Sequence, residues 1–169
     1  MELSWPRSKS DPALLPIEPD IALYERAIAN YQYGDLAAAR TAIKELVARH
    51  PSDAWYLEFA GDIYLSSARP DEAISYYQSA LDKRPDDPLI SLSLGRALIA
   101  TNQPDQLEQA VTALETTLKT EPDWGFAKRQ LAIAYGRLGK LSHADILLGE
   151  EAMARGDKER AIFLARRVL

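Results

Sequence analysis

The sequence predicts an all-α protein built from repeated pairs of short helices. The segment 54–87 is typical of one such pair, because large apolar residues alternate with small ones such as Gly61 in helical phase. The same residue types return at a fixed distance: Gly61 to Gly95 is 34 residues, and Pro51 to Pro85 is also 34. One helix pair cannot bury its apolar faces alone, so a period of this size predicts a solenoid in which neighbouring pairs stack.

Composition excludes several other classes of protein. The chain has 169 residues, of which 47% are hydrophobic and 27% charged, and this balance is typical of globular proteins rather than disordered ones. The net charge of −5 argues against nucleic-acid binding, which needs a basic face. No apolar run approaches the roughly 18–20 residues of a membrane span, and no signal-peptide pattern opens the chain. The absence of cysteine excludes disulfides and thiol catalysis.

Residues 1–19 are expected to form a non-helical lead-in. They contain four prolines, and proline both lacks a backbone N–H donor and pushes the preceding residue towards extended geometry. Two interpretations of the apolar residues in this segment stay open. Trp5 and the pair 14–15 either pack on the first helices or belong to a loosely held tail.

The repeat domain is expected to span residues 20–169. Its predicted parts are four units, 20–53, 54–87, 88–124 and 125–155, followed by a closing helix at 157–169. The third unit is longer than the others, because Pro85 to Pro122 is 37 residues instead of 34. We expect the three extra residues around 104–109, where they lengthen either the loop or the start of the second helix.

The end of the chain departs from the regular pattern. No proline stop follows Ala144, so the helix 142–155 is expected to continue to a break at Gly156. That helix would serve twice, as the second helix of the fourth unit and the first helix of an incomplete fifth. The last of nine helices would then cover the open end of the stack, as terminal units of solenoids must.

The sequence offers no recognisable catalytic or metal-binding motif. The two histidines, His50 and His143, fall in different units, and there is no HExxH motif or Cys/His cluster. No serine stands in a G-x-S-x-G elbow, and the glycines form no phosphate-binding loop. We therefore expect this chain to have no catalytic residues, no metal and no cofactor, and to act through its surface.

The period of 34 with a helix–turn–helix in each unit resembles the tetratricopeptide repeat (TPR). The resemblance implies a right-handed α-solenoid of about four units plus a closing helix, whose first helices line a concave face that binds extended or helical peptides. Carried onto this sequence, the inner face comprises Tyr24, Ile28, Tyr31, Trp55, Glu58, Asp62, Leu65, Leu89, Leu92, Arg96, Phe126, Arg129, Ile133 and Arg137. Aromatic residues and arginines are the types that most often anchor interfaces.

Two interpretations of this inner-face set remain open. The residues either bind a partner, or about half of them pack against neighbouring helices or the lead-in. Arrays that clamp a C-terminal carboxylate use lysine and asparagine at set inner positions, where this chain has residues such as Glu58 and Asp62, so that clamp is not expected. Arg96, Arg129 and Arg137 are candidates for a local anion site.

Several strings resemble one family more closely. The insertion NQPDQLEQAV, the string RQLAIAYGRLG and the ending AxxARGDxxxA are similar to the C-terminal repeats of bacterial BepA-like periplasmic zinc metallopeptidases, and the lead-in WPRSKSD is similar to their joining segment. The resemblance implies a non-catalytic domain that docks on the parent protease domain and engages outer-membrane β-barrel proteins in the periplasm. The alternative is a stand-alone TPR scaffold in a cytoplasmic or periplasmic assembly.

Overall fold

The structure, a computed structural model, describes residues 19–168. Nine α-helices and no strands lie in that range: α1 (Pro19–Gln32), α2 (Leu36–Arg49), α3 (Ala54–Ser66), α4 (Pro70–Lys83), α5 (Pro88–Thr101), α6 (Pro104–Thr120), α7 (Gly125–Arg137), α8 (Leu141–Ala154) and α9 (Lys158–Val168). The predicted all-α solenoid is confirmed. The packing expected of Trp5 and of residues 14–15 lies outside the described residues.

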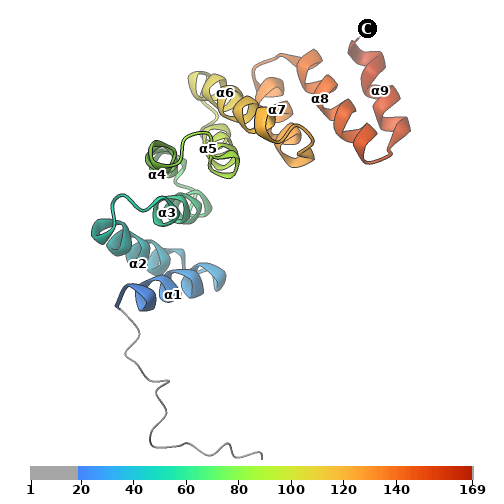
Figure 1. The fold of residues 1–169 in the computed structure, drawn as a ribbon. Coiled ribbons are helices and arrows are strands. Elements are labelled where there is room, and N and C mark those ends of the chain that lie inside the picture. Colours follow the sequence, from blue (N-terminus) through green and yellow to red (C-terminus); the bar gives the residue numbers. More distant parts are fainter. Residues whose placement is uncertain (1–18, 169) are drawn as a thin grey trace, which may run out of the picture.

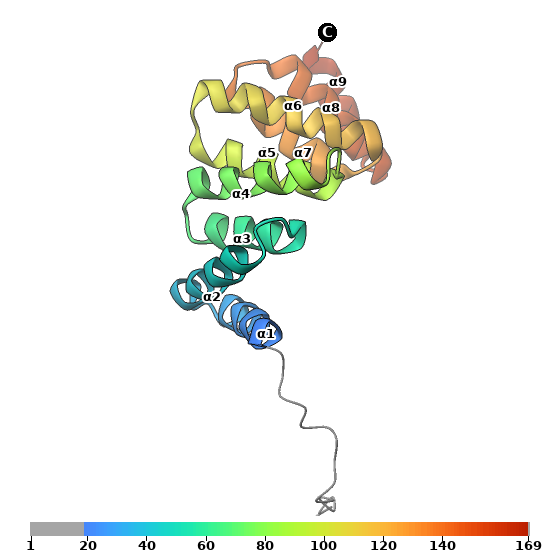
Figure 2. The ribbon, with the colours of Figure 1, turned by 60° about the vertical axis from the view of Figure 1, so that its left-hand side comes forward.

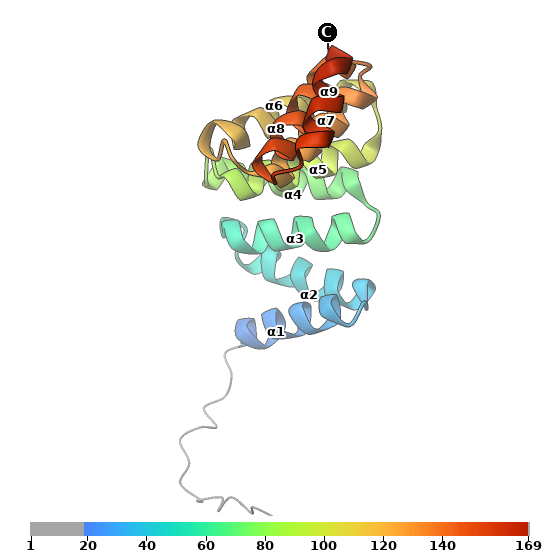
Figure 3. The ribbon, with the colours of Figure 1, turned by 90° about the vertical axis from the view of Figure 1, so that its right-hand side faces the viewer.

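The helices stack into a curved array (Figure 1). The odd-numbered helices α1, α3, α5 and α7 follow the inner side of the curve, while α2, α4 and α6 follow the outer side. Direct contacts of α3 with α5 and of α5 with α7 make the inner side one continuous layer. The turned views place α1 and α9 at opposite ends of the stack (Figures 2 and 3). No helix in residues 19–168 is both long and apolar enough to cross a lipid bilayer.

Aspartates fix where several helices begin. The side chain of Asp53 accepts hydrogen bonds from the backbone N–H groups of Trp55 and Tyr56 at the start of α3. Asp87 does the same for the first N–H groups of α5, which would otherwise lack partners. The backbone N–H of Trp55 is thus held by the cap of α3.

The turn inside each helix pair contains one residue with a left-handed backbone. These residues are Gly34, Ala68, Asn102, Gly139 and Gly156. After three of them the next N–H donates to the carbonyl five residues earlier, which is the Schellman arrangement: Arg69 to Tyr64, Lys140 to Tyr135 and Asp157 to Ala152. The first three turns are 34 residues apart, whereas Gly156 follows Gly139 after only 17. α8 therefore lies between two such turns, following the one at Gly139 and preceding the one at Gly156.

Glycine at two of the helix crossings allows the helices to pack closely. A Cβ atom added to Gly61 would lie 2.5 Å from Cε1 of Tyr77, and one added to Gly95 would lie 2.6 Å from Cγ of Leu114. Tyr77 and Leu114 are both fully buried. Each large side chain thus occupies the space that a glycine on the facing helix leaves open.

The three extra residues of the third unit belong to a helix. α6 has 17 residues and α4 has 14, yet each begins two residues after the left-handed residue of its turn. Leu114 lies twelve residues after Asn102 but takes the place of Tyr77, which lies nine after Ala68. The added residues therefore lengthen the first part of α6 and leave the loop unchanged.

Candidate functional site

The candidate site is the inner face, by which we mean the side chains on α1, α3, α5 and α7 that belong to the predicted set. α1 carries Tyr24, Ile28 and Tyr31; α3 carries Trp55, Glu58, Asp62 and Leu65; α5 carries Leu89, Leu92 and Arg96; α7 carries Phe126, Arg129, Ile133 and Arg137. Their surroundings divide them into side chains that contact solvent and side chains that contact other helices.

A row of apolar side chains follows the first turns of the inner helices. We call Ile21, Trp55, Leu89 and Phe126 the first-turn ladder. The exposed fraction is 51% for Ile21, 64% for Trp55 and 54% for Leu89, and Phe126 is partly buried. Ile21 was missing from the predicted set, although its distance of 34 residues from Trp55 is a signal that could have found it.

The ladder lies beside the segments that join one helix pair to the next. The guanidinium carbon of Arg84 stands 4.5 Å from the centroid of the Trp55 ring, and Arg84 is held by an ion pair with Asp87. Leu89 borders a hollow of about 510 Å³ together with Glu121 and Trp124. The ladder thus combines exposed apolar surface with fixed neighbours, a setting in which a bound side chain loses water without much ordering of the protein.

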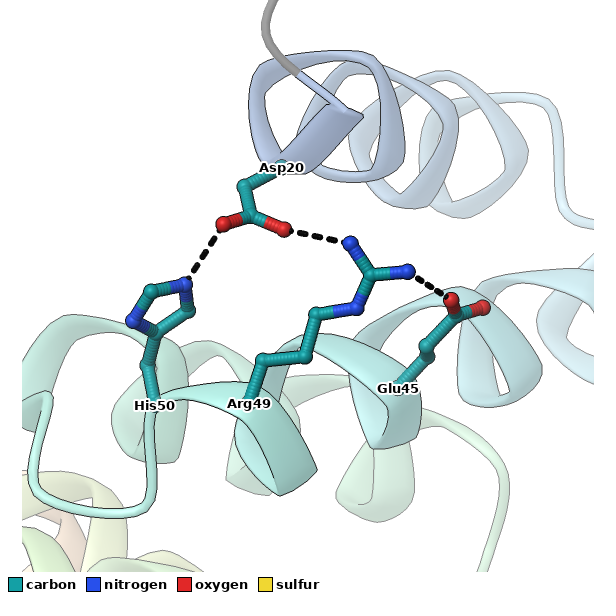
Figure 4. A network of polar contacts seen from close by, with 4 residues as sticks. All are labelled: Asp20, Glu45, Arg49 and His50. Atoms are coloured by element: carbon teal, nitrogen blue, oxygen red, sulfur yellow. Dashed lines mark hydrogen bonds and ion pairs between the residues drawn. The ribbon is translucent and has the colours of Figure 1, made fainter.

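The corresponding corner of the first pair is held by polar contacts (Figure 4). Asp20, next to Ile21, accepts a hydrogen bond from Arg49 at 2.7 Å and lies 2.7 Å from Nε2 of His50. These two hydrogen bonds, first His50 and then Arg49, lower the pKa of Asp20. Arg49 also pairs with Glu45. The network joins the start of α1 to the end of α2, so His50 has a structural partner.

Two carboxylates make the α3 part of the inner face acidic. Burial raises the pKa of Glu58, and the charge of Asp62 one turn away raises it further. Burial also raises the pKa of Asp62, against the effect of the Tyr77 hydroxyl, which donates to its Oδ1 at 2.7 Å. Asp62 is therefore oriented by α4, while Glu58 makes no ion pair within residues 19–168 and is the carboxylate that can meet a cation.

The α5–α7 part of the inner face is basic. The guanidinium groups of Arg96 and Arg129 each lie 5.7 Å from the ring centroid of Phe126. Arg129 is also paired with Glu151, and Arg137 donates to the carbonyl of Ile99 at 2.6 Å.

The three arginines that were predicted to form an anion site thus have different roles, because Arg129 and Arg137 already bind groups of this chain. Arg96 has no carboxylate within ion-pair distance among residues 19–168, so it is the guanidinium that can meet an acidic group. Phe126 stands beside it and offers an apolar contact at the same point.

Other predicted residues hold the helices together. The ring of Tyr24 lies 5.6 Å from that of Tyr56 and 5.8 Å from that of Phe59, and Tyr31 lies 5.6 Å from Phe59. These contacts join α1 to α3, and neither Tyr56 nor Phe59 was recognised from the sequence. Leu92 is only 5% exposed and belongs to the core. For these members of the set, packing explains the residue.

The described residues contain no group of three or more His, Asp or Glu side chains that could hold a metal ion. A hollow of about 600 Å³ lies between α4, α5 and α6, and polar side chains such as Gln78, Asp82 and Gln109 line it. It contains no member of the predicted inner face. The exposed apolar side chains with nearby charges therefore remain the strongest candidate site.

Family profiles and curated relatives agree on the type of repeat. Profiles described as tetratricopeptide repeat match residues 21–53 and 64–132. The chain is 34% identical over 85 residues to the beta-barrel assembly-enhancing protease of Escherichia coli (strain K12), which is 50% of this chain and 17% of that protein. It is 34% identical over 80 residues to mouse tetratricopeptide repeat protein 21B, covering 47% of this chain and 6% of that protein. The matched part is thus less than a fifth of these relatives.

Solved structures resemble the chain over most of its length. MamA (residues 41 to the end) from Desulfovibrio magneticus RS-1 superposes with a TM-score of 0.74 at 16% identity, covering 88% of this chain and 92% of that one. YrrB superposes with a TM-score of 0.74 at 14% identity, covering 88% and 75%. At such low identity these likenesses establish the solenoid fold.

Proposed function

Because the chain belongs to the tetratricopeptide repeat family and is a protein-interaction module, we propose that its inner face docks an extended or helical protein segment. We further propose that it is the non-catalytic docking part of a periplasmic zinc-dependent protease that acts in outer-membrane protein quality control. Its partners would be outer-membrane β-barrel proteins and the parent protease domain, which would supply the zinc site and the catalysis.

The first-turn ladder is the observation that supports docking. Each inner helix from α1 to α7 contributes one ladder residue, and three of the four are more than half exposed. A segment that lies across the inner helices would meet an apolar contact in each helix pair. Arg96 beside Phe126 would orient an acidic residue of that segment, while Glu58 would favour a basic one nearer α3.

The protease context is supported by the curated relatives. Four of them carry the name beta-barrel assembly-enhancing protease, at 32–34% identity over about half of this chain. Since this chain spans 17% of their length, the activity and the partners of these relatives are assigned to it only as a proposal.

The second candidate is a stand-alone scaffold. It is favoured by solved repeat arrays of similar length, of which this chain covers 75% and 92%. One of them, YrrB, is described as a TPR protein with an unusual peptide-binding site.

Photo-crosslinking in cells tests the docking surface. A photoreactive phenylalanine analogue placed at Trp55 or Leu89 is expected to capture a protein partner, whereas the same analogue at Tyr33 is not. Tyr33 is a suitable control because it is 89% exposed and stands outside the ladder. Equal capture from all three positions would contradict inner-face docking.

Two further results separate the candidates. Capture of an outer-membrane β-barrel protein, with an HExxH segment in the same reading frame, supports the protease-associated function. An open reading frame without such a segment leaves only the scaffold.

A further inference from the structure

A hollow of about 320 Å³ opens between α8 and α9 at the end of the stack, and we call it the terminal socket. Its lining includes Asp145, Ile146, Gly149, Glu150, Met153 and Ala165. Apolar groups around it face solvent, since Ile146 is 48% and Met153 71% exposed. Phe163 and Ile162 on α9 are also more than half exposed, at 59% and 54%. A terminal helix that only capped the array would present a polar outer face instead.

The register of the repeat explains why the socket exists. Gly149 lies seven residues before the left-handed residue Gly156, just as Gly61 lies seven before Ala68. Nine residues after that turn residue, α4 has Tyr77, but the same position of α9 is Ala165. The last pair has therefore kept the small residue that leaves a space and has lost the large side chain that fills it.

The local distances support this comparison. A Cβ atom on Gly61 would lie 2.5 Å from the Tyr77 ring, whereas the nearest atom to a Cβ on Gly149 is 3.8 Å away, on Leu164. Tyr77 is fully buried, and Ala165 is exposed. In the middle of the array the next inner helix, α5, packs against both α3 and α4. Within residues 19–168 no helix follows α9, so nothing described covers the socket.

We propose that the terminal socket receives a large apolar side chain from an amphipathic helix of a partner protein, which packs on α8–α9 as α5 packs on α3–α4. The site is separate from the inner face. It uses the same packing as the array's own helices, in which a large side chain fills the space over a glycine, but here the partner helix supplies the large side chain.

The charges around the socket indicate an acidic partner helix. Residues 155–168 contain five basic and two acidic side chains. Arg155 and Arg167 pair with Glu151 and Asp145 of α8, so the basic side chains without an ion pair among residues 19–168 are Lys158, Arg160 and Arg166. The two carboxylates that line the socket already have partners, since Asp145 pairs with Arg167 at 3.1 Å and Glu150 with Lys128 at 2.8 Å.

Lys158 lines the adjoining hollow beside Ile162 and pairs with no carboxylate among the residues that the structure describes. A second copy docked two-fold through this face would bring two basic surfaces together. An acidic helix would instead complement the surface.

The test uses a hydrocarbon-stapled, fluorescent peptide with the sequence of residues 54–66. This sequence has large apolar residues and two acidic ones, and it lacks basic residues. Fluorescence anisotropy with the whole chain is expected to give a micromolar dissociation constant. Ala165→Leu fills the socket from within and should weaken binding at least tenfold while raising the midpoint of thermal unfolding. The matched control Ala48→Leu adds the same side chain at an exposed site on α2 and should change neither.

Further variants separate this proposal from the inner-face function. Lys158→Glu should weaken peptide binding several-fold, and Trp55→Ala should leave it unchanged. Absent binding, or equal binding by the Ala165→Leu and Ala48→Leu variants, would overturn the socket. A dimer seen by light scattering that Ala165→Leu dissociates would assign the socket to a second copy and overturn the partner helix. None of these results depends on the photo-crosslinking outcome at Trp55.

Discussion

The helix pairs α3–α4 and α8–α9 have the same spacing between a glycine and the left-handed residue of the turn, but the space above the glycine is filled in the first pair and open in the second. In the first, Tyr77 packs over Gly61 and neighbouring helices cover both. In the second, Ala165 stands at the position of Tyr77, and the space over Gly149 stays open. The glycine by itself therefore does not distinguish a closed crossing from a binding site. The residue on the facing helix makes the difference, and α5 packs over the first pair whereas no helix within residues 19–168 packs over the second in this way.

Removing the Tyr77 side chain should convert the closed pair into a copy of the open one. Tyr77→Ala is expected to lower the free energy of unfolding by about 3–5 kcal/mol, because it leaves a cavity where a fully buried ring was. Tyr77→Phe is the control, since it removes only the hydrogen bond to Asp62 and should cost about 1 kcal/mol. Urea unfolding followed by circular dichroism measures both. Equal costs would mean that ring packing does not close this pair.

The two glycines should respond with opposite signs to the same substitution. Gly61→Ala puts a methyl group against the Tyr77 ring and should cost about 2 kcal/mol, within the range for overpacked cores. Gly149→Ala meets only an ordinary contact at 3.8 Å and should stabilise the chain by up to about 1 kcal/mol through helix propensity. Thermal unfolding of both variants is the measurement. A loss at Gly149 would show that the socket is narrower than its geometry indicates.

The sequence contained enough to predict the solenoid, because its repeat sets small and large residues at a constant spacing. Gly61, Gly95 and the displaced Leu114 could be placed in this way. The partners of Arg129 and Arg137 could not, since Glu151 and Ile99 lie 22 and 38 residues away and come near only because α7 packs on α8 and on α5. Repeat spacing shows which residues share a position, but not which of those positions the next helix covers. The unit limits and the inner-face contacts remain predictions.

The two helix pairs also differ in how a buried polar side chain is stabilised, and the stability of the chain at low pH should reveal this difference. Burial alone would raise the pKa of Glu151, but hydrogen bonds from Arg155 and Arg129 lower it overall. A lowered pKa means that this contribution to stability is present above the unfolded pKa and is lost as pH falls through the folded one. Glu151→Gln should therefore cost about 1–2 kcal/mol at pH 7, with the difference shrinking below about pH 4.

Thermal unfolding of wild type and Glu151→Gln between pH 3 and 7 measures this difference. Glu150→Gln is the control, because Glu150 is exposed and its pair with Lys128 lies at the surface. It should cost less than about 0.5 kcal/mol. A Glu151→Gln penalty that persisted unchanged at pH 3 would show that the charge of Glu151 is not what joins α7 to α8.

The smallest expected effect has the opposite sign and belongs to the inner face of α3. Burial, and after it the charges of Asp62 and Asp87, raises the pKa of Glu58. A carboxyl group whose pKa is raised by folding destabilises the folded state when it is ionised, so its cost appears above the unfolded pKa and disappears in acid. Glu58→Gln should therefore stabilise the chain at pH 7 by a few tenths of a kcal/mol, the typical size of a like-charge pair one turn apart.

The gain from Glu58→Gln should vanish near pH 4, where residue 58 is largely uncharged in the folded and in the unfolded chain, whether it is Glu or Gln. Glu108→Gln on the exposed side of α6 is the control and should change stability little at either pH. Differential scanning calorimetry at the two pH values measures the effect. A Glu58→Gln variant less stable than wild type at pH 7 would mean that Glu58 has a favourable partner within the chain. Its destabilised charge would then no longer support the assignment of this side chain to partner binding.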